Sequence, residues 1–232
     1  MAFFNWLASV FKSAFSKKEI AAPIPTPKPV QDTKPSEPSV VKPEPVVVLP
    51  PIAKPDPAKI NLLDAIKVCI KPYENLREIN GKNRSALIDK IITSHGGSLG
   101  SAYCCYGVQQ LLDDVETYYA NHGMKIKFDI PAGGSTQALW AKAKAEYKFI
   151  NAKPASLVVW RHMSAPSTGH IGTCLSFADA GEFKTFEFNT SAGTAAVIRD
   201  GEGAYYRTRK LKDVGDMHVL GFIDLEKAMI RL

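Results

Sequence analysis

The chain contains no Cys-x-x-Cys pair, and it has no glycine before Gly81. Its four cysteines are Cys69, Cys104, Cys105 and Cys174, so the paired spacing of a structural zinc site is missing. A chain of 232 residues can bury a core without disulfide bonds. Free thiols, and synthesis in a reducing compartment, are therefore the simpler interpretation.

The charge of the chain is only moderately unbalanced. Hydrophobic residues make up 45% and charged residues 22%, with a net charge of +6, which is ordinary for a soluble globular protein. A positive excess suits contact with a cell wall, a membrane surface or nucleic acid. About half of it lies in residues 60–232, where it is spread without a cluster, so no nucleic-acid partner is expected.

Residues 1–18 form the first of three segments and predict an amphipathic helix. Its apolar residues recur at helical spacing, and Lys12, Lys17 and Lys18 lie on the other side or at the end. The segment is too short, and too interrupted by Lys12, to span a bilayer. It also lacks the positive start of a secretory signal. We expect contact with a membrane surface or a partner protein, or docking on its own domain.

Residues 19–59 predict a linker, because 12 of the 16 prolines lie there. Proline fixes φ and removes the backbone donor, so neither helix nor sheet can propagate through such a stretch. Polyproline II conformers make it a semi-rigid spacer.

Residues 60–232, which hold all 16 glycines, predict a folded domain. Apolar periodicity and capping signals predict helices at 60–71, 85–95, 103–122 and 136–147. Alternating patterns predict strands at 156–161, 170–177, 184–189, 195–199, 204–208 and 218–223. Helices followed by short strands indicate an α+β fold, with the helices packed on an antiparallel sheet of about six strands.

Two cysteines, Cys104 and Cys105, fall in the first turn of the predicted helix at 103–122. Unpaired N–H groups and the positive end of the helix dipole lower the pKa of a thiol there. Because the thiolate is the reactive form, this is a good place for a nucleophile. The alternative is that both are small core residues, as free cysteines often are.

Two further polar elements lie on predicted strands. His170 begins a strand between Gly169 and Gly172, which leave room for another group to approach. Glu187 and Asn189 are two residues apart on the next strand and should share a face. A buried polar pair needs partners, and an imidazole on the neighbouring strand would supply one. Cysteine, histidine and a polar orienting residue follow the triad logic of papain-like hydrolases.

Four short motifs in this order resemble the CHAP domain, the cysteine- and histidine-dependent amidohydrolases/peptidases of phage endolysins and bacterial cell-wall hydrolases. The motifs are Ser-Ala-Tyr-Cys-Cys-Tyr-Gly-Val, Ser-Leu-Val-Val-Trp, Gly-His-Ile-Gly and Glu-Phe-Asn-Thr, and the likeness covers roughly residues 75–225. Ala155-Ser156 stands where Gly-Asp is usual, and Phe188 replaces a small residue. The resemblance implies a papain-like fold.

The resemblance also implies roles for particular residues. Cys104, which follows an aromatic residue as in the family, would be the nucleophile, and His170 would exchange protons with it and with the leaving amine. Glu187 or Asn189 would orient the imidazole, with Glu187 favoured because a carboxylate also stabilises an imidazolium. The backbone N–H of Cys104 is a candidate for the oxyanion hole. No Asp-rich loop of suitable spacing occurs, so we expect no obligatory metal and no cofactor.

Other features of the sequence carry weaker signals. Residues 96–100 match the G-x-S-x-G pattern of serine hydrolases, but a predicted helix rather than a strand precedes them. Arg207, Arg209 and Lys210 predict a solvated basic face. Trp140 and Trp160 are expected in the core.

The sequence and the resemblance together predict a peptidoglycan amidase or endopeptidase, of the phage-lysis or wall-degrading kind. It would be made in the host cytoplasm and act in the periplasm or cell wall. Two alternatives remain open. One is an inactive CHAP-like structural or binding module of a virion, and the other is a cysteine hydrolase effector that acts on protein.

Overall fold

The computed structural model describes residues 60–192 and 201–232. The predicted helix at 1–18, the predicted linker at 19–59 and the predicted strand at 195–199 lie outside these residues. Among the described helices, none has the length and apolar character needed to cross a membrane.

Most helices begin at a residue whose side chain caps the first turn. Asn61, Ser85 and Ser135 accept hydrogen bonds from backbone N–H groups three residues on, and Asp224 caps in the same manner. The helices so started are α1 (Leu62–Ile70), α2 (Ala86–Ser94), α4 (Thr136–Lys142) and α5 (Leu225–Ala228). The longest, α3 (Cys104–Asn121), begins differently, because Tyr103 at its N-cap makes no side-chain capping bond.

The main sheet has six strands in the order β2-β7-β3-β4-β5-β6, and neighbours pair antiparallel. Its strands are β2 (Lys148–Phe149), β3 (Ser156–His162), β4 (Gly169–Cys174), β5 (Glu182–Thr190), β6 (Gly203–Lys210) and β7 (Met217–Asp224). A second sheet of two strands joins β1 (Ile126–Phe128) to β8 (Met229–Arg231).

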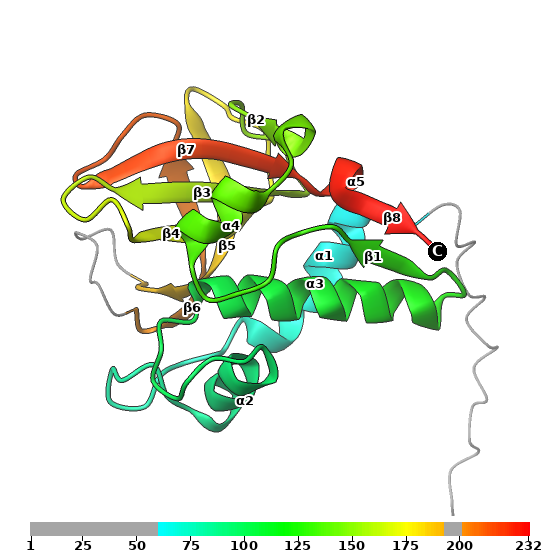
Figure 1. The fold of residues 1–232 in the computed structure, drawn as a ribbon, viewed down its shortest axis with the longest axis horizontal. Coiled ribbons are helices and arrows are strands. Elements are labelled where there is room, and N and C mark those ends of the chain that lie inside the picture. Colours follow the sequence, from blue (N-terminus) through cyan, green and yellow to red (C-terminus); the bar gives the residue numbers. More distant parts are fainter. Residues whose placement is uncertain (1–59, 193–200) are drawn as a thin grey trace, which may run out of the picture. The chain divides into compact units, whose positions relative to one another are not determined.

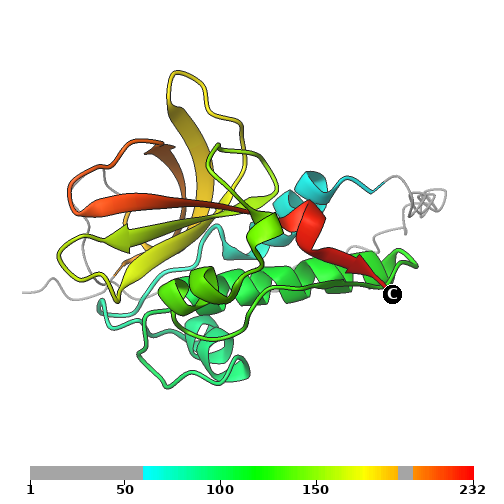
Figure 2. The same ribbon diagram turned by 45° about the horizontal axis from the view of Figure 1, so that its top comes forward.

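The helix α3 lies between the sheet and α2. Figures 1 and 2 both show the strands gathered over the N-terminal half of α3, with β1 and β8 beside its C-terminal half and α2 on the side away from the sheet. Gly107 allows this approach, since a Cβ there would lie 2.2 Å from Cγ of Phe188 on β5. The start of α3 is thereby held directly against the sheet.

Alternating side chains divide the core into two clusters on the two faces of the sheet. The larger cluster joins the helices to the sheet and includes Val108, Ile171, Phe186 and Phe188. The smaller one lies on the opposite face and is built from Ala152, Val158, Trp160, Cys174, Phe183, Met217 and Phe222. Both sides of the central strands are therefore buried.

The predicted α+β class with an antiparallel sheet of about six strands is confirmed. The helix predicted at 136–147 is too long, because Ala143 leaves the helical region with ψ of 140° and a separate 3₁₀ turn follows at Ala145–Tyr147. The strands β1, β2 and β8 were not predicted. At two or three residues each, they are too short to produce an alternating pattern.

Candidate active site

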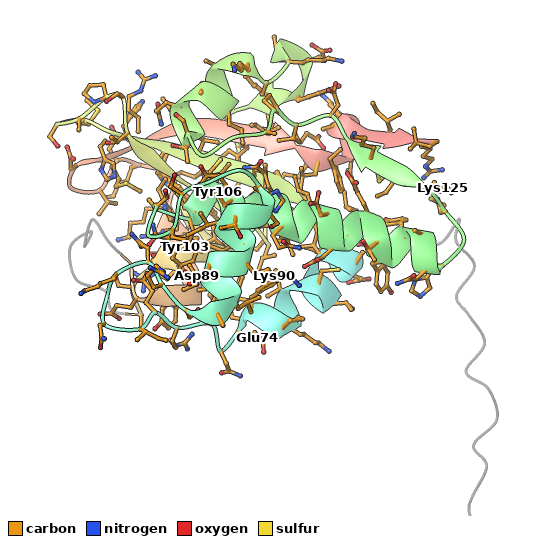
Figure 3. All side chains as sticks on the ribbon, turned by 60° about the horizontal axis from the view of Figure 1, so that its bottom comes forward. Glu74, Asp89, Lys90, Tyr103, Tyr106 and Lys125 are labelled. Atoms are coloured by element: carbon orange, nitrogen blue, oxygen red, sulfur yellow. The ribbon has the colours of Figure 1, made fainter. Side chains whose placement is uncertain are left out.

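The N-cap residue of α3 is Tyr103, and its side chain makes no capping hydrogen bond to the backbone N–H groups of the first turn. Tyr103 is fully buried, and burial together with the neighbouring Glu78 carboxylate raises the pKa of its phenol. Figure 3 shows Tyr103 and Tyr106 near the end of α3 that is remote from Lys125. Uncapped N–H groups at a helix start attract negative charge, so this turn suits a thiolate or an oxyanion.

The two cysteines of this turn have different surroundings. Cys104 retains slight exposure, whereas Cys105 is fully buried. Burial raises the pKa of the Cys105 thiol to about 12, and the neighbouring Cys104 adds to this effect. Cys105 therefore stays a neutral thiol at neutral pH, while Cys104 interacts with His170 and contributes to raising the pKa of its imidazole. Of the two, Cys104 is the one with a partner suited to chemistry.

His170 reaches this turn from β4, where it pairs with Trp160 across the β3–β4 ladder. The Trp160 ring stacks on the imidazole with centroids 5.6 Å apart and planes inclined by 29°. Gly169 is needed beside it, because a Cβ there would lie 2.3 Å from Nε2 of Gln137, whose amide donates to the Trp160 carbonyl oxygen at 2.8 Å. These contacts hold the His170 imidazole in place on the sheet.

Glu187 on β5 contacts the imidazole from the other side. Its Oε2 lies 3.0 Å from Nε2 of His170, which leaves Nδ1 as the ring nitrogen available to Cys104. Gly172 makes room for the carboxylate, since a Cβ there would lie 2.6 Å from Cγ of Glu187. The structure therefore brings Cys104, His170 and Glu187 together, with Glu187 hydrogen-bonded to the imidazole and Cys104 interacting with it.

Two further residues hold the Glu187 carboxylate. Thr185 donates its hydroxyl to Oε1 at 2.5 Å. Arg209 on β6 donates Nε to Oε1 at 2.8 Å and Nη2 to Oε2, which makes a bidentate pair. The prediction that Arg209 belongs to a solvated basic face is therefore wrong: its guanidinium turns inward because the neighbouring carboxylate is fully buried.

These contacts shift the pKa of both partners. Burial lowers the pKa of His170, but its hydrogen bonds and charge interactions with Cys104 and Glu187 outweigh burial and raise it to about 9. Burial likewise raises the pKa of Glu187, and the Arg209 and His170 contacts reverse this, holding it well below its usual value. At neutral pH the site holds an imidazolium and a carboxylate.

Asn189, the alternative orienting residue, contacts a different partner. Its Oδ1 accepts a hydrogen bond from the Gly201 backbone N–H at 3.0 Å. The β5–β6 register shifts between Glu187 and Thr190, and Asn189 has φ of 54°, in the left-handed region. The bulge interrupts the alternation that would place Asn189 on the face of Glu187. Of the two candidates, Glu187 is the one that contacts His170.

No protein-family model matches this chain, and no curated protein matches it by sequence. The assignment of the site therefore rests on the geometry of Cys104, His170 and Glu187.

The described residues offer few competing sites. Within residues 60–192 and 201–232, no group of three or more His, Cys, Asp or Glu side chains could hold a metal ion. The G-x-S-x-G stretch at 96–100 follows α2 rather than a strand, so it lacks the strand-to-helix elbow of serine hydrolases. Trp160 lies in the smaller core cluster as expected, and Trp140 is partly buried against the larger cluster.

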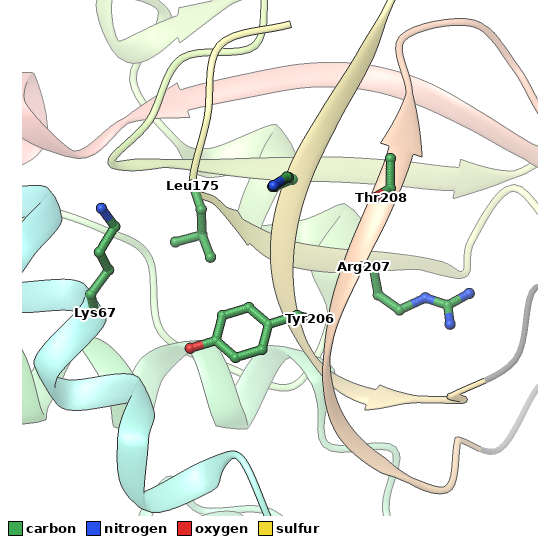
Figure 4. Close-up of a pocket in the computed structure, with 6 residues that line it drawn as sticks. Lys67, Leu175, Tyr206, Arg207 and Thr208 are labelled. Atoms are coloured by element: carbon green, nitrogen blue, oxygen red, sulfur yellow. The ribbon is translucent and has the colours of Figure 1, made fainter. Parts of the chain in front are cut away.

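A surface hollow of about 490 Å³ lies elsewhere, between α1, the end of β4 and the β5–β6 pair. It is lined by Lys67, Leu175, Lys184, Tyr206, Arg207 and Thr208. Figure 4 shows Arg207 pointing away from Lys67, Leu175 and Tyr206. None of Cys104, His170 and Glu187 lines this hollow, so the hollow is separate from the candidate active site.

Proposed function

We propose that the chain is a cysteine-dependent amidohydrolase/peptidase of the papain-like CHAP kind, and that it hydrolyses amide or peptide bonds in peptidoglycan. The observation that carries the proposal is the line of contacts from Cys104 through His170 to Glu187. A thiol at the start of a long helix, packed against an antiparallel sheet that supplies the histidine and its carboxylate, is the arrangement that such hydrolases need.

The reaction would begin from a Cys104 thiolate and a His170 imidazolium. The sulfur attacks the carbonyl carbon, and the oxyanion that forms accepts hydrogen bonds from N–H groups of the uncapped first turn, including that of Cys104. His170 then gives its proton to the leaving amine, and a thioester remains on Cys104. His170 next takes a proton from water, which attacks the thioester and releases the acid and the thiolate.

The remaining residues support this cycle by their positions. Glu187 is ionised and 3.0 Å from the ring, so it stabilises the imidazolium and fixes the orientation of the ring. The buried, neutral Cys105 cannot substitute for Cys104 as nucleophile. The choice of peptidoglycan as substrate rests on the four CHAP-like motifs and on the net charge of +6, which suits an anionic wall polymer.

The test is loss of turbidity with purified cell walls of several chemotypes, together with zymography. The wild type should clear at least one wall type. Cys104→Ala should abolish clearing, and Cys105→Ala, a matched change one residue away, should retain it. Failure of the wild type to clear any wall type would count against the proposal.

The two alternatives predict different outcomes of related experiments. An inactive virion module predicts a Cys104 that does not react with iodoacetamide at neutral pH. An effector that acts on protein predicts Cys104-dependent cleavage of protein rather than muropeptides, which mass spectrometry of the products would distinguish.

A further inference from the structure

Four side chains from four strands close a ring of contacts around the Glu187 carboxylate. His170 on β4 contacts Glu187 on β5, and Arg209 on β6 binds the same carboxylate through two nitrogens. The Arg209 guanidinium also lies 5.5 Å from the ring centroid of Trp160 on β3, and Trp160 stacks on His170. With Thr185, the carboxylate receives four polar contacts, about as many as two carboxylate oxygens accept.

We infer that Arg209 is a positioning residue of this site, which keeps Glu187 charged and aimed at His170. The inference rests on the proposed function, because it assigns a role within the same Cys104–His170 chemistry. Arg209 is not a catalytic residue: its guanidinium contacts Glu187, Thr190 and Trp160, and it acts on the imidazole through Glu187 and Trp160.

Burial explains why the carboxylate needs this partner. Glu187 is fully buried, so solvent does not stabilise its charge. Without the guanidinium, burial favours the neutral form of the carboxyl group more strongly, and its pKa rises. A protonated Glu187 would no longer stabilise an imidazolium on His170. The guanidinium is suited to the task because its planar fork matches both carboxylate oxygens and is always charged.

The ring of contacts also restricts the direction in which Glu187 points. Two parallel N–H bonds from Arg209 fix the plane of the carboxylate, whereas a single bond would let it rotate. The Arg209 guanidinium also lies over the Trp160 ring, and that ring stacks on the His170 imidazole. Arg209 therefore contacts both side chains that hold the His170 imidazole, namely Glu187 and Trp160.

Other charges near the carboxylate must be separated from this effect. The titratable and charged groups that face Glu187 are His170 on β4 and both Arg209 and Arg207 on β6. Cys104 on α3 interacts with His170. Arg207 donates to the Ser191 carbonyl oxygen instead of to Glu187, so it offers a matched control: the same residue type on the same strand, without the bidentate pair.

The experiment measures the rate at which iodoacetamide alkylates Cys104 as a function of pH, with Cys104 and Cys105 distinguished by peptide mass spectrometry. The rate of alkylation depends on the fraction of Cys104 present as thiolate, and the measurement needs no substrate. In Arg209→Gln the acid limb of the profile should move to higher pH by about 1 unit or more, because Glu187 now takes up a proton in that range. Arg209→Lys should restore most of the limb position, and Arg207→Gln should move it much less.

A double-mutant cycle tests whether Arg209 acts through Glu187. In a Glu187→Gln background, Arg209→Gln should cause no upward shift of the acid limb, because no carboxyl group remains to take up a proton. An equal upward shift in that background would overturn the inference. So would an even loss of rate at all pH values in Arg209→Gln, which is the signature of a merely structural role.

Two further measurements keep the outcome decisive. Thermal unfolding by circular dichroism checks that each variant folds, and if Arg209→Gln does not, Arg209→Lys decides: an upward shift of a few tenths of a unit supports the inference, and an unmoved limb overturns it. Wall clearing is measured separately. A limb that shifts as expected in a protein that clears no wall would contradict the peptidoglycan proposal and leave the positioning role of Arg209 standing.

Discussion

Two of the histidines on this sheet, His170 and His218, pair with carboxylates and differ strongly in burial. His218 on β7 and Asp213 are 2.7 Å apart, with 42% and 54% of their side chains exposed. His170 and Glu187 are 3.0 Å apart, with 12% and 0% exposed. In the buried pair, the contacts of His170 with Cys104 and Glu187 outweigh burial and raise its pKa to about 9. Water screens charges in an exposed pair, whereas charges in a buried pair are screened much less.

The buried pair also has partners that the exposed pair lacks in the described structure. Arg209 and Thr185 hold the carboxylate, and Cys104 contacts the imidazole. A histidine whose charge is set by such neighbours is typical of functional sites.

Replacement of the two histidines should separate the pairs most strongly. His170→Ala should lower wall-clearing activity by roughly 10²- to 10⁴-fold, because it removes the group that accepts and donates the proton. His218→Ala should leave activity close to wild type. Initial clearing rates at equal protein concentration provide the measurement, and similar losses in both variants would contradict the comparison.

Replacement of the carboxylate should destabilise the protein more in the buried pair than in the exposed pair. Glu187→Gln leaves the inward-turned Arg209 without its charge partner and should lower the free energy of unfolding by about 3–5 kcal/mol. Asp213→Asn breaks an exposed pair that water screens, so it should change the free energy of unfolding far less. Urea unfolding followed by fluorescence measures both values, and equal losses would show that burial is not the deciding factor.

The raised pKa of His170 predicts a pH dependence of stability. Its folded value of about 9 exceeds the unfolded value of about 6.5, so its contribution is fully present below pH ~6.5 and is lost as pH rises through the folded value. The unfolding free energy should therefore decline by on the order of 3 kcal/mol across this window. His170→Gln should remove this decline relative to wild type, and His218→Gln should retain it.

The smallest effect should come from the hydroxyl that supports Glu187. Thr185→Val keeps the shape of the side chain and removes one hydrogen bond to a buried carboxylate, so we expect a loss of about 1–2 kcal/mol. Thr208→Val on β6 changes an exposed threonine and should stay within about 0.5 kcal/mol. Thermal unfolding of the two variants compares them directly, and matching melting temperatures would argue against the Thr185 contact.

The sequence predicted those parts of the molecule that depend on local patterns. The periodicity of residues 103–122 located α3 to within a residue or so and put Cys104 in its first turn. The glycines that flank His170 predicted close approach, and Gly172 does make room for Glu187. These features need only the 3.6-residue and two-residue repeats and the missing Cβ of glycine.

Features that depend on how strands pair were missed. Whether Arg209 faces solvent or Glu187 is decided by the register of β5 against β6, and no local pattern of β6 reveals it. Asn189 differs from expectation for a related reason: a bulge with positive φ breaks the alternation beyond Glu187. Both residues could be placed only once the neighbouring strands were known.

The contact between Gly107 and Phe188 has a consequence for how this protein can vary. Helix and strand meet there with no side-chain atom of the helix between them, so a larger residue would force the fully buried Phe188 side chain or α3 to move. A displacement of α3 would move Cys104, which lies three residues earlier in the same helix, away from His170. A single methyl group at position 107 could thus disconnect the sulfur from the imidazole while every polar residue of the site remained in the sequence.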